Sequence, residues 1–223
     1  MKAFPQELLP EWYVIAAVIF GALVVYGIVH HLLLKLRETA IRKSGDQLGL
    51  AIYRNEKELR EQEGWDVTEI TRRNALFTNC WHQEITNILY AENDGLSVFV
   101  FDQKYDELKS VANNRKLGIR QTVVAIVSQE IDVQKFELSV SGMVEHGFYE
   151  DFAKGIFEFL EKHPKTTVEG HRQTILIYEP GRRFRPSDYS DLVGRGFEVF
   201  QILKTKDDSP EKRLANNQPL TVH

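Results

Sequence analysis

Cysteine is nearly absent from this chain, which contains only Cys80 among its 223 residues. A single thiol cannot form an internal disulfide, so the fold cannot depend on a disulfide framework, and the shortage agrees with a reducing compartment. An excess of basic charge is also missing, since 28 Lys and Arg residues stand against 32 Asp and Glu residues. A general nucleic-acid-binding protein normally has a strongly basic domain, so we expect no nucleic-acid partner.

Motifs for metal, nucleotide and nucleophilic chemistry are missing as well. None of the seven histidines stands in an HxxxH or HExxH pattern, and the sequence has no GxGxxG or GxxxxGK(S/T) loop. Cys80, His82 and Glu84 would share one face of a strand, but no neighbouring group could orient them as a catalytic set. We therefore predict no metal, no cofactor and no recognisable catalytic residue.

Charge is absent from one long segment, the 23 residues from Trp12 to Leu34, WYVIAAVIFGALVVYGIVHHLLL. A helix that rises 1.5 Å per residue would extend about 34 Å over that length, enough to cross a hydrocarbon core of roughly 30 Å. Trp12 and Tyr13 stand at one end, where amphipathic rings favour the lipid headgroups. We therefore predict a transmembrane helix over residues 12–34.

Two other interpretations fit this segment less well. A cleaved signal peptide has an apolar region of about 7–15 residues between a basic start and a small-residue cleavage site. Here only Lys2 precedes the apolar run, which is longer and ends in His30, His31 and leucines. A buried helix of a soluble domain would normally show a polar face, and this segment has none.

The residues that flank the apolar segment predict its orientation. The tail of residues 1–11 contains one basic residue, whereas Lys35, Arg37, Arg42 and Lys43 follow the segment closely. By the positive-inside rule the N-terminal tail lies outside and the C-terminal bulk is cytoplasmic. We expect a single-pass protein of the cell (inner) membrane, with the lipid bilayer as its first partner.

Residues 35–77 are expected to form a juxtamembrane helix and a charged connector. The sequence after Leu34 continues as a polar, amphipathic helix, and Gly49 can supply the left-handed residue that ends it. From Tyr53 to Phe77 the chain is highly charged, and the pairs Glu56–Arg60 and Lys57–Glu61 suit a solvated helix face. A helix and a loop both remain open for this connector.

Residues 78–203 are expected to form one cytoplasmic α+β domain. Asn93-Asp94-Gly95 between apolar alternations predicts a β-hairpin, and 120–129 is nearly apolar throughout, as in a central strand. A turn is expected near Gly170-His171, and Ser187 is a candidate cap for the last helix. The predicted strands are 85–90, 96–105, 120–129, 135–140, 166–170 and 173–179, and the predicted helices are 148–163 and 187–203.

Two amphipathic helices are expected to cover one face of a mainly antiparallel sheet of about five or six strands. One helix would present Phe148, Phe152, Ile156, Phe157 and Leu160, and the other Tyr189, Leu192, Val193, Phe197, Phe200 and Leu203. Gly194 and Gly196 would let the last helix approach the sheet closely. A barrel-like sheet of the pleckstrin-homology type is an alternative, because the first four strands read as a meander. The polar tail of residues 204–223 is expected to be disordered.

Several motifs together resemble a family of bacterial membrane-anchored proteins of unknown function. Its members are expected to have one or two N-terminal spans, an LGL helix end, an FDYxY strand followed by QTV, and a closing VEG hairpin that ends in a tyrosine and PG. Gln103 departs from the tyrosine of FDY, and the segment between Val140 and Phe148 is shorter than the family pattern. The resemblance covers about residues 36–203 and implies no catalytic residue. The matching stretches are Leu48-Gly49-Leu50, Phe101–Tyr105, Gln121-Thr122-Val123, Val168-Glu169-Gly170 and Tyr178–Gly181.

One basic loop is the candidate binding feature. Arg182, Arg183 and Arg185 surround an aromatic residue and, together with Arg72-Arg73, could contact anionic lipid headgroups. The alternative is a solvated turn whose arginines pair with the nearby acidic residues Glu179, Asp188 and Asp191.

The sequence favours a non-enzymatic binding or scaffold module that holds a protein or lipid partner at the inner membrane face. The competing hypothesis is a membrane-tethered hydrolase in which Asp102, His82 and Glu84 or His146 converge in space. Convergence of those side chains would favour the enzyme, whereas scattered positions would favour the module.

Overall fold

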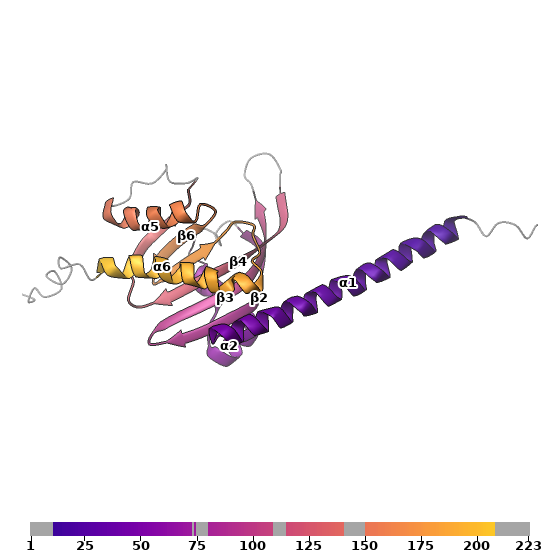
Figure 1. The fold of residues 1–223 in the computed structure, drawn as a ribbon, viewed down its shortest axis with the longest axis horizontal. Coiled ribbons are helices and arrows are strands. Elements are labelled where there is room, and N and C mark those ends of the chain that lie inside the picture. The colour runs from indigo at the N-terminus through magenta and orange to yellow at the C-terminus, as the bar shows by residue number, and fades with distance from the viewer. Residues whose placement is uncertain (1–10, 73, 75–79, 109–114, 141–149, 208–223) are drawn as a thin grey trace, which may run out of the picture. The chain divides into compact units, whose positions relative to one another are not determined.

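The computed structural model describes residues 11–72, 74, 80–108, 115–140 and 150–207. The chain divides into two compact units, Met1–Ile41 and Arg42–His223. Figure 1 shows the long helix α1 in the first part of the chain and the sheet with its helices in the second.

Helix α1 runs from Glu11 to Leu48. Every described side chain from Ile15 to Leu34 is exposed, although nearly all are apolar. In the described part of the chain, α1 is the one helix long and apolar enough to cross a membrane. The predicted N-terminal apolar helix is confirmed, and so is its polar continuation. The helix ends as expected at Gly49, whose φ is 67°, while the Leu50 amide donates to the Gly45 carbonyl at 2.9 Å.

The described residues of Arg42–His223 form one seven-stranded sheet, with the order β1-β2-β3-β4-β7-β6-β5 and every pair antiparallel. The predicted α+β class is confirmed, and β4 is the central strand, as expected. The predicted meander holds for its first three strands, β2, β3 and β4, but it is wrong for the fourth, because β5 pairs with β6 at the far edge of the sheet. The strand count exceeds the expected five or six, because a short edge strand precedes the meander. The strands are β1 Ala51–Asn55, β2 Cys80–Asn93, β3 Leu96–Leu108, β4 Arg115–Ser128, β5 Val133–Leu138, β6 Thr167–Arg172 and β7 Thr174–Tyr178.

The two predicted hairpin turns have different outcomes. Asp94 and Gly95 have φ angles of 50° and 75°, which confirms the β2–β3 turn. The turn between β6 and β7 lies at Arg172-Gln173, because His171 pairs with Thr174, so the expected position near Gly170-His171 is wrong. Gly170 instead lies inside β6, where the Phe136 ring occupies the space that a side chain would fill.

Helices cover both faces of the sheet. On one face, α6 (Tyr189–Asp207) lies over the central strands, and α5 (Glu150–Lys162) packs on α6. A Cβ atom at Gly196 would lie 3.1 Å from Ile126 and Val124, so this glycine permits the close approach that was predicted. A Cβ atom at Gly194 would have no atom within 4 Å. The prediction that Gly194 permits close approach to the sheet is therefore wrong.

The other face is covered by two short helices that the sequence left open as helix or loop. Helix α2 (Glu56–Glu63) and helix α3 (Val67–Thr71) bury Leu59 and Val67 against the sheet. Lys57 pairs with Glu61 at 3.7 Å, as predicted. The predicted Glu56–Arg60 pair is wrong, because Arg60 contacts Asp66 and Glu56 accepts hydrogen bonds from Thr68.

Several predicted side-chain positions differ from the structure. Among the described side chains of α5, the aromatic residue Phe159 is buried, whereas Phe157 is half-buried. In α6 Phe197 is exposed, although the other five predicted residues are buried. Ser187 lies within the 3₁₀ helix η1 (Pro186–Asp188), where its hydroxyl donates to Asp188, so it does not cap α6. Phe148, the side chain of Phe152 and residues 208–223 lie outside the described residues.

Candidate functional site

The basic loop between β7 and η1 is held to the sheet through ion pairs. Arg182 Nη1 donates to Glu179 Oε2 at 2.5 Å, and its guanidinium carbon lies 4.4 Å from the Phe184 ring centroid. Arg183 donates to Asp102 Oδ2 from Nε at 3.0 Å and from Nη2 at 2.7 Å. Arg185 is exposed and immediately precedes η1. The alternative of pairing with Glu179 therefore holds for Arg182, and Arg183 has an unexpected partner 81 residues away.

Asp102 is the centre of this polar cluster and is only 4% exposed. Besides the two bonds from Arg183, its carboxylate accepts hydrogen bonds from Asn87 Nδ2 at 3.0 Å and Thr122 Oγ1 at 2.9 Å. Asn87 has a φ of 55° and lies at a register shift in β2. A buried carboxylate requires such donors, because desolvation without them would be very costly.

The backbone of the basic loop is also bonded to β4. The Phe184 amide donates to Thr122 Oγ1 at 3.0 Å, and the Gly181 amide donates to Gln121 Oε1 at 3.1 Å. The Thr122 amide in turn donates to the Arg182 carbonyl at 3.0 Å. These bonds explain why polar residues stand in the middle of a nearly apolar strand.

A third arginine extends this network to α6. Arg195 Nη1 donates to Glu179 Oε1 at 3.0 Å, and its Nη2 donates to Asp191 Oδ2 at 2.6 Å. Glu179 is buried, and it accepts hydrogen bonds from both Arg182 and Arg195. Asp191 was considered as a partner for the basic loop, but it pairs with Arg195 of α6 instead. The predicted lipid contact of Arg182, Arg183 and Arg185 stays a prediction.

Of the residues in the hydrolase hypothesis, the structure describes the side chains of Asp102 and Glu84, and each of them has other partners. The Asp102 carboxylate binds Arg183, Asn87 and Thr122, while Glu84 pairs with Lys104 at 3.7 Å. The side chains of Cys80 and His82 and all of His146 lie outside the described residues. Among the residues that the structure describes, no group of three or more His, Cys, Asp and Glu could hold a metal ion.

Two tyrosines stabilise the face of the sheet that α2 and α3 cover. Tyr53 donates to the Glu63 carboxylate, and Tyr90 donates to Glu92 while it accepts a bond from Trp65 Nε1 at 2.7 Å. Burial, with a further contribution from the adjacent carboxylates, raises the pKa of both tyrosines to about 12. These contacts fix α2 and the residues that follow it against β1 and β2.

A buried tyrosine and carboxylate lie further along the same face. Tyr178 donates to Glu169 Oε1 at 2.5 Å, and Glu169 has no exposed surface. Burial raises the pKa of Tyr178 well above its ordinary value, and the Glu169 charge adds to that shift. Tyr178 is therefore a neutral donor near neutral pH, which compensates the burial of Glu169.

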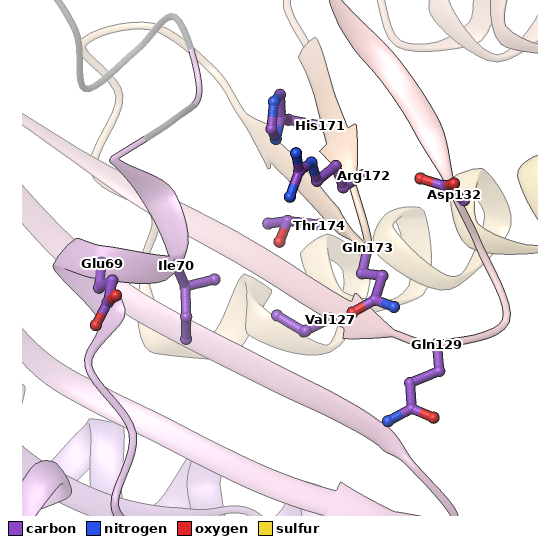
Figure 2. A pocket seen from close by; sticks show the side chains of 9 residues that line it. All are labelled: Glu69, Ile70, Val127, Gln129, Asp132, His171, Arg172, Gln173 and Thr174. Carbon is purple, nitrogen blue, oxygen red and sulfur yellow. The ribbon is translucent and has the colours of Figure 1, made fainter.

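An open hollow of about 830 Å³ lies where α3 faces the β6–β7 hairpin (Figure 2). Its charged residues come from three places: Glu69 from α3, Asp132 from the β4–β5 connection, and Arg172 from the hairpin turn. This lining combines both signs of charge with amides, a hydroxyl and a small apolar area. The other lining residues are Ile70, Val127, Gln129, His171, Gln173 and Thr174.

None of the residues around this hollow was predicted as a site residue. The hollow depends on the exact turn position and on α3, and the sequence pattern specified neither. The one available signal was the dipeptide Arg172-Gln173, which lacks the Gly or Asn that a two-residue hairpin turn usually contains.

No protein-family model and no curated protein matches the chain. The structure is similar to the crystal structure of the mycobacterial trehalose monomycolate transport factor A, TtfA. The TM-score is 0.50 at 11% sequence identity, and the match covers 75% of this chain and 94% of TtfA. At this identity the similarity shows the fold alone.

Proposed function

We propose that this chain is a single-pass membrane protein whose α+β domain is a non-enzymatic binding or scaffold module at the inner membrane face. The observation that supports this best is helix α1, in which the described side chains of residues 12–34 are all exposed and nearly all apolar. Exposed apolar surface of this extent requires a lipid or protein environment. In this proposal the helix anchors the domain, with the N-terminus outside and the domain in the cytoplasm.

The charged groups of the domain support a binding role over catalysis. Asp102 and Glu179 are buried and neutralised by arginines, which makes them parts of a structural network. The hollow beside α3, in contrast, presents exposed charges and amides that are accessible to a partner. TtfA is named as a transport factor, and a shared fold is compatible with a binding role without specifying its ligand. We also propose that the chain belongs to the membrane-anchored family that its motifs resemble.

Membrane anchoring is tested by alkaline carbonate extraction of cell membranes. The full chain is expected to remain in the membrane pellet. A Leu23→Arg, Val25→Arg double variant should be released, because each arginine near the middle of a span costs about 2.5–3.5 kcal/mol of insertion free energy. The matched control is Lys104→Arg, Lys165→Arg, which leaves the span unchanged. Release of the unaltered protein would contradict the anchor.

The scaffold role is tested by crosslinking in cells followed by purification of the full-length protein. A control retains only residues 1–43 and therefore lacks the domain. A protein recovered in near-equal amount with the full chain, and absent from the control, is the expected result. Recovery of the same proteins with both would show that the domain does not select them.

A further inference from the structure

Two carboxyl groups from different elements meet between α2 and α3. Glu56, the first residue of α2, accepts a hydrogen bond from the Thr68 amide, and its second oxygen accepts one from Thr68 Oγ1 at 2.9 Å. Asp66, which caps α3, accepts from the Glu69 amide at 2.9 Å and shares the Thr68 amide with Glu56. The two carboxyl groups are also hydrogen bonded to each other. These contacts join the start of α2 to the start of α3.

A hydrogen bond between two carboxyl groups requires a proton, because an ionised carboxylate can only accept. Burial raises the pKa of Glu56, and the bond to Asp66 adds to that rise. Burial acts in the same direction on Asp66, but the bond from Glu56, the Glu69 amide and the Arg60 charge outweigh it and lower the pKa of Asp66. Glu56 is therefore the residue that holds the proton, and Asp66 is the ionised acceptor.

The charges around this pair do not compensate two carboxylates. Among the described residues, Arg60 of α2 is the cation that contacts the pair, through an ion pair with Asp66. The Glu69 side chain of α3 is exposed and adds a further negative charge to the same region. The titratable groups on the strands that pack against α2 and α3 have other partners: Tyr53 binds Glu63, Tyr90 binds Glu92 and Tyr178 binds Glu169. The proton on Glu56 thus replaces a second cation.

Helix α3 has few other attachments. It contains only the five residues Val67–Thr71, of which Val67 and Thr71 are buried. A helix this short is unstable by itself, so its contacts with α2 and the sheet decide whether it remains folded. Segments with little buried surface open locally at low cost in free energy. Glu69 and Ile70 of α3 line the hollow, so an opening of α3 would displace one of its walls.

We propose that a single proton held between Glu56 and Asp66 keeps α3 attached to α2, and that α3 loosens when rising pH removes this proton. The folded pKa of Glu56 lies above its ordinary value of 4.5, so the stabilisation is complete below pH 4.5 and is lost as pH rises through the folded pKa. Asp66 behaves in the opposite way, since its lowered pKa gives stability above pH 3.8 that is lost only in stronger acid. The effect on a partner bound in the hollow rests on the proposed binding role, whereas the proton-dependent contact does not.

The test is hydrogen exchange of the α3 amides in the full chain in nonionic detergent, from about pH 4.5 to about pH 8. The rates are corrected for the intrinsic pH dependence of exchange. The Ile70 and Arg72 amides report on α3, because they donate to the Asp66 and Thr68 carbonyls at 3.0 and 2.8 Å. Their protection should fall at least about threefold as pH rises, while that of the central strand β4 should stay constant. Constant protection of α3 over this range would overturn the proposal.

Glu56→Gln imitates the protonated state at every pH. Its amide can donate to Asp66 while its oxygen accepts from Thr68. Protection of α3 should then be independent of pH and equal to that of the unaltered chain near pH 4.5. Glu61→Gln is the matched control, because it removes the same charge from an exposed position of the same helix, and it should retain the full pH dependence. Retained pH dependence in Glu56→Gln would contradict the proposal.

Asp66→Asn keeps the cap of α3 and provides a second test should Glu56→Gln not fold. The Asn amide can donate to an ionised Glu56, so the pair no longer needs a proton. The carboxyl carbon resonance of Glu56 should titrate above pH 4.5 in the unaltered chain and at a lower pH in Asp66→Asn. Identical titration in both would overturn the shared proton. None of these results depends on the protein recovered by crosslinking, so this inference and the scaffold role can fail separately.

Discussion

Asp102 shows how much of this domain depends on individual charged side chains. Its carboxylate is buried between strands and accepts four hydrogen bonds, two of them from Arg183. Since Asp102 and Arg183 are 81 residues apart, the pair joins the basic loop to the middle of the sheet. Removing one partner of a buried pair leaves the other charge uncompensated, which costs more than the pair itself contributes.

Arg183→Met is therefore expected to lower the free energy of unfolding by about 2–4 kcal/mol. The measurement is denaturant unfolding of the full chain in detergent, followed by tryptophan fluorescence. Arg185→Met is the matched control, because Arg185 is exposed in the same loop, and its effect should stay within about 0.5 kcal/mol. Equal effects of the two variants would show that the Asp102 contact is not important for stability.

Tyr53 gives the domain a predictable response to alkaline pH. Its pKa is about 12 in the folded chain, against about 10 when unfolded. Because the folded pKa is the higher one, the stabilisation is complete below pH 10 and is lost as pH rises toward 12. Tyr53→Phe should be less stable at neutral pH and should lose less stability between pH 10 and 12. An unchanged alkaline slope in unfolding experiments would contradict this role.

At the scale of elements, the sequence predicted regular structure where the apolar pattern was long. The alternation on both sides of Asp94-Gly95 specified the β2–β3 hairpin, and the apolar run of β4 specified the central strand. Strand β1 was not predicted, because only Tyr53 of its five residues is buried and the strand lies at the sheet edge. Short, polar edge strands take their conformation from their neighbour rather than from their own pattern.

Two glycines in α6 give a matched test of helix packing. Gly194→Val should change stability little or raise it slightly, since the position is exposed and valine has a better helix propensity than glycine. Gly196→Val should lower stability by about 1–3 kcal/mol, because its side chain would press against Ile126 and Val124. The same unfolding measurement compares both variants, and equal stabilities would mean that α6 can move away from the sheet without cost.

At the scale of the whole molecule, the sequence predicted the apolar helix and the fold class but not the candidate site. An uncharged run of 23 residues needs no tertiary information to be recognised. The hollow beside α3, in contrast, brings together Glu69, Asp132 and Arg172 from three separate segments. No local pattern relates these residues, and the hydrogen bonds that position the hairpin become visible only in the folded sheet.

Orientation in the membrane can be measured with a single introduced thiol. Cys80→Ala removes the native cysteine, and Ser190→Cys then places a thiol at an exposed position on α6. An impermeant maleimide should label this variant only after cell lysis if the domain is cytoplasmic. Gln6→Cys in the same background should be labelled in intact cells. The reverse pattern would invert the proposed topology.

The contact between Ser44 and the Pro186 carbonyl has a mechanical consequence. The chain passes from the end of α1 into β1, which is an edge strand, so tension applied through the helix would first peel β1 from β2. Ser44 Oγ donates to the Pro186 carbonyl at 2.7 Å, beside the loop that is bonded to β4. Part of any pulling force therefore acts on the centre of the sheet, and less of it acts on the β1–β2 pair. A domain attached in this way can resist drag on a bound partner better than its edge strand alone would allow.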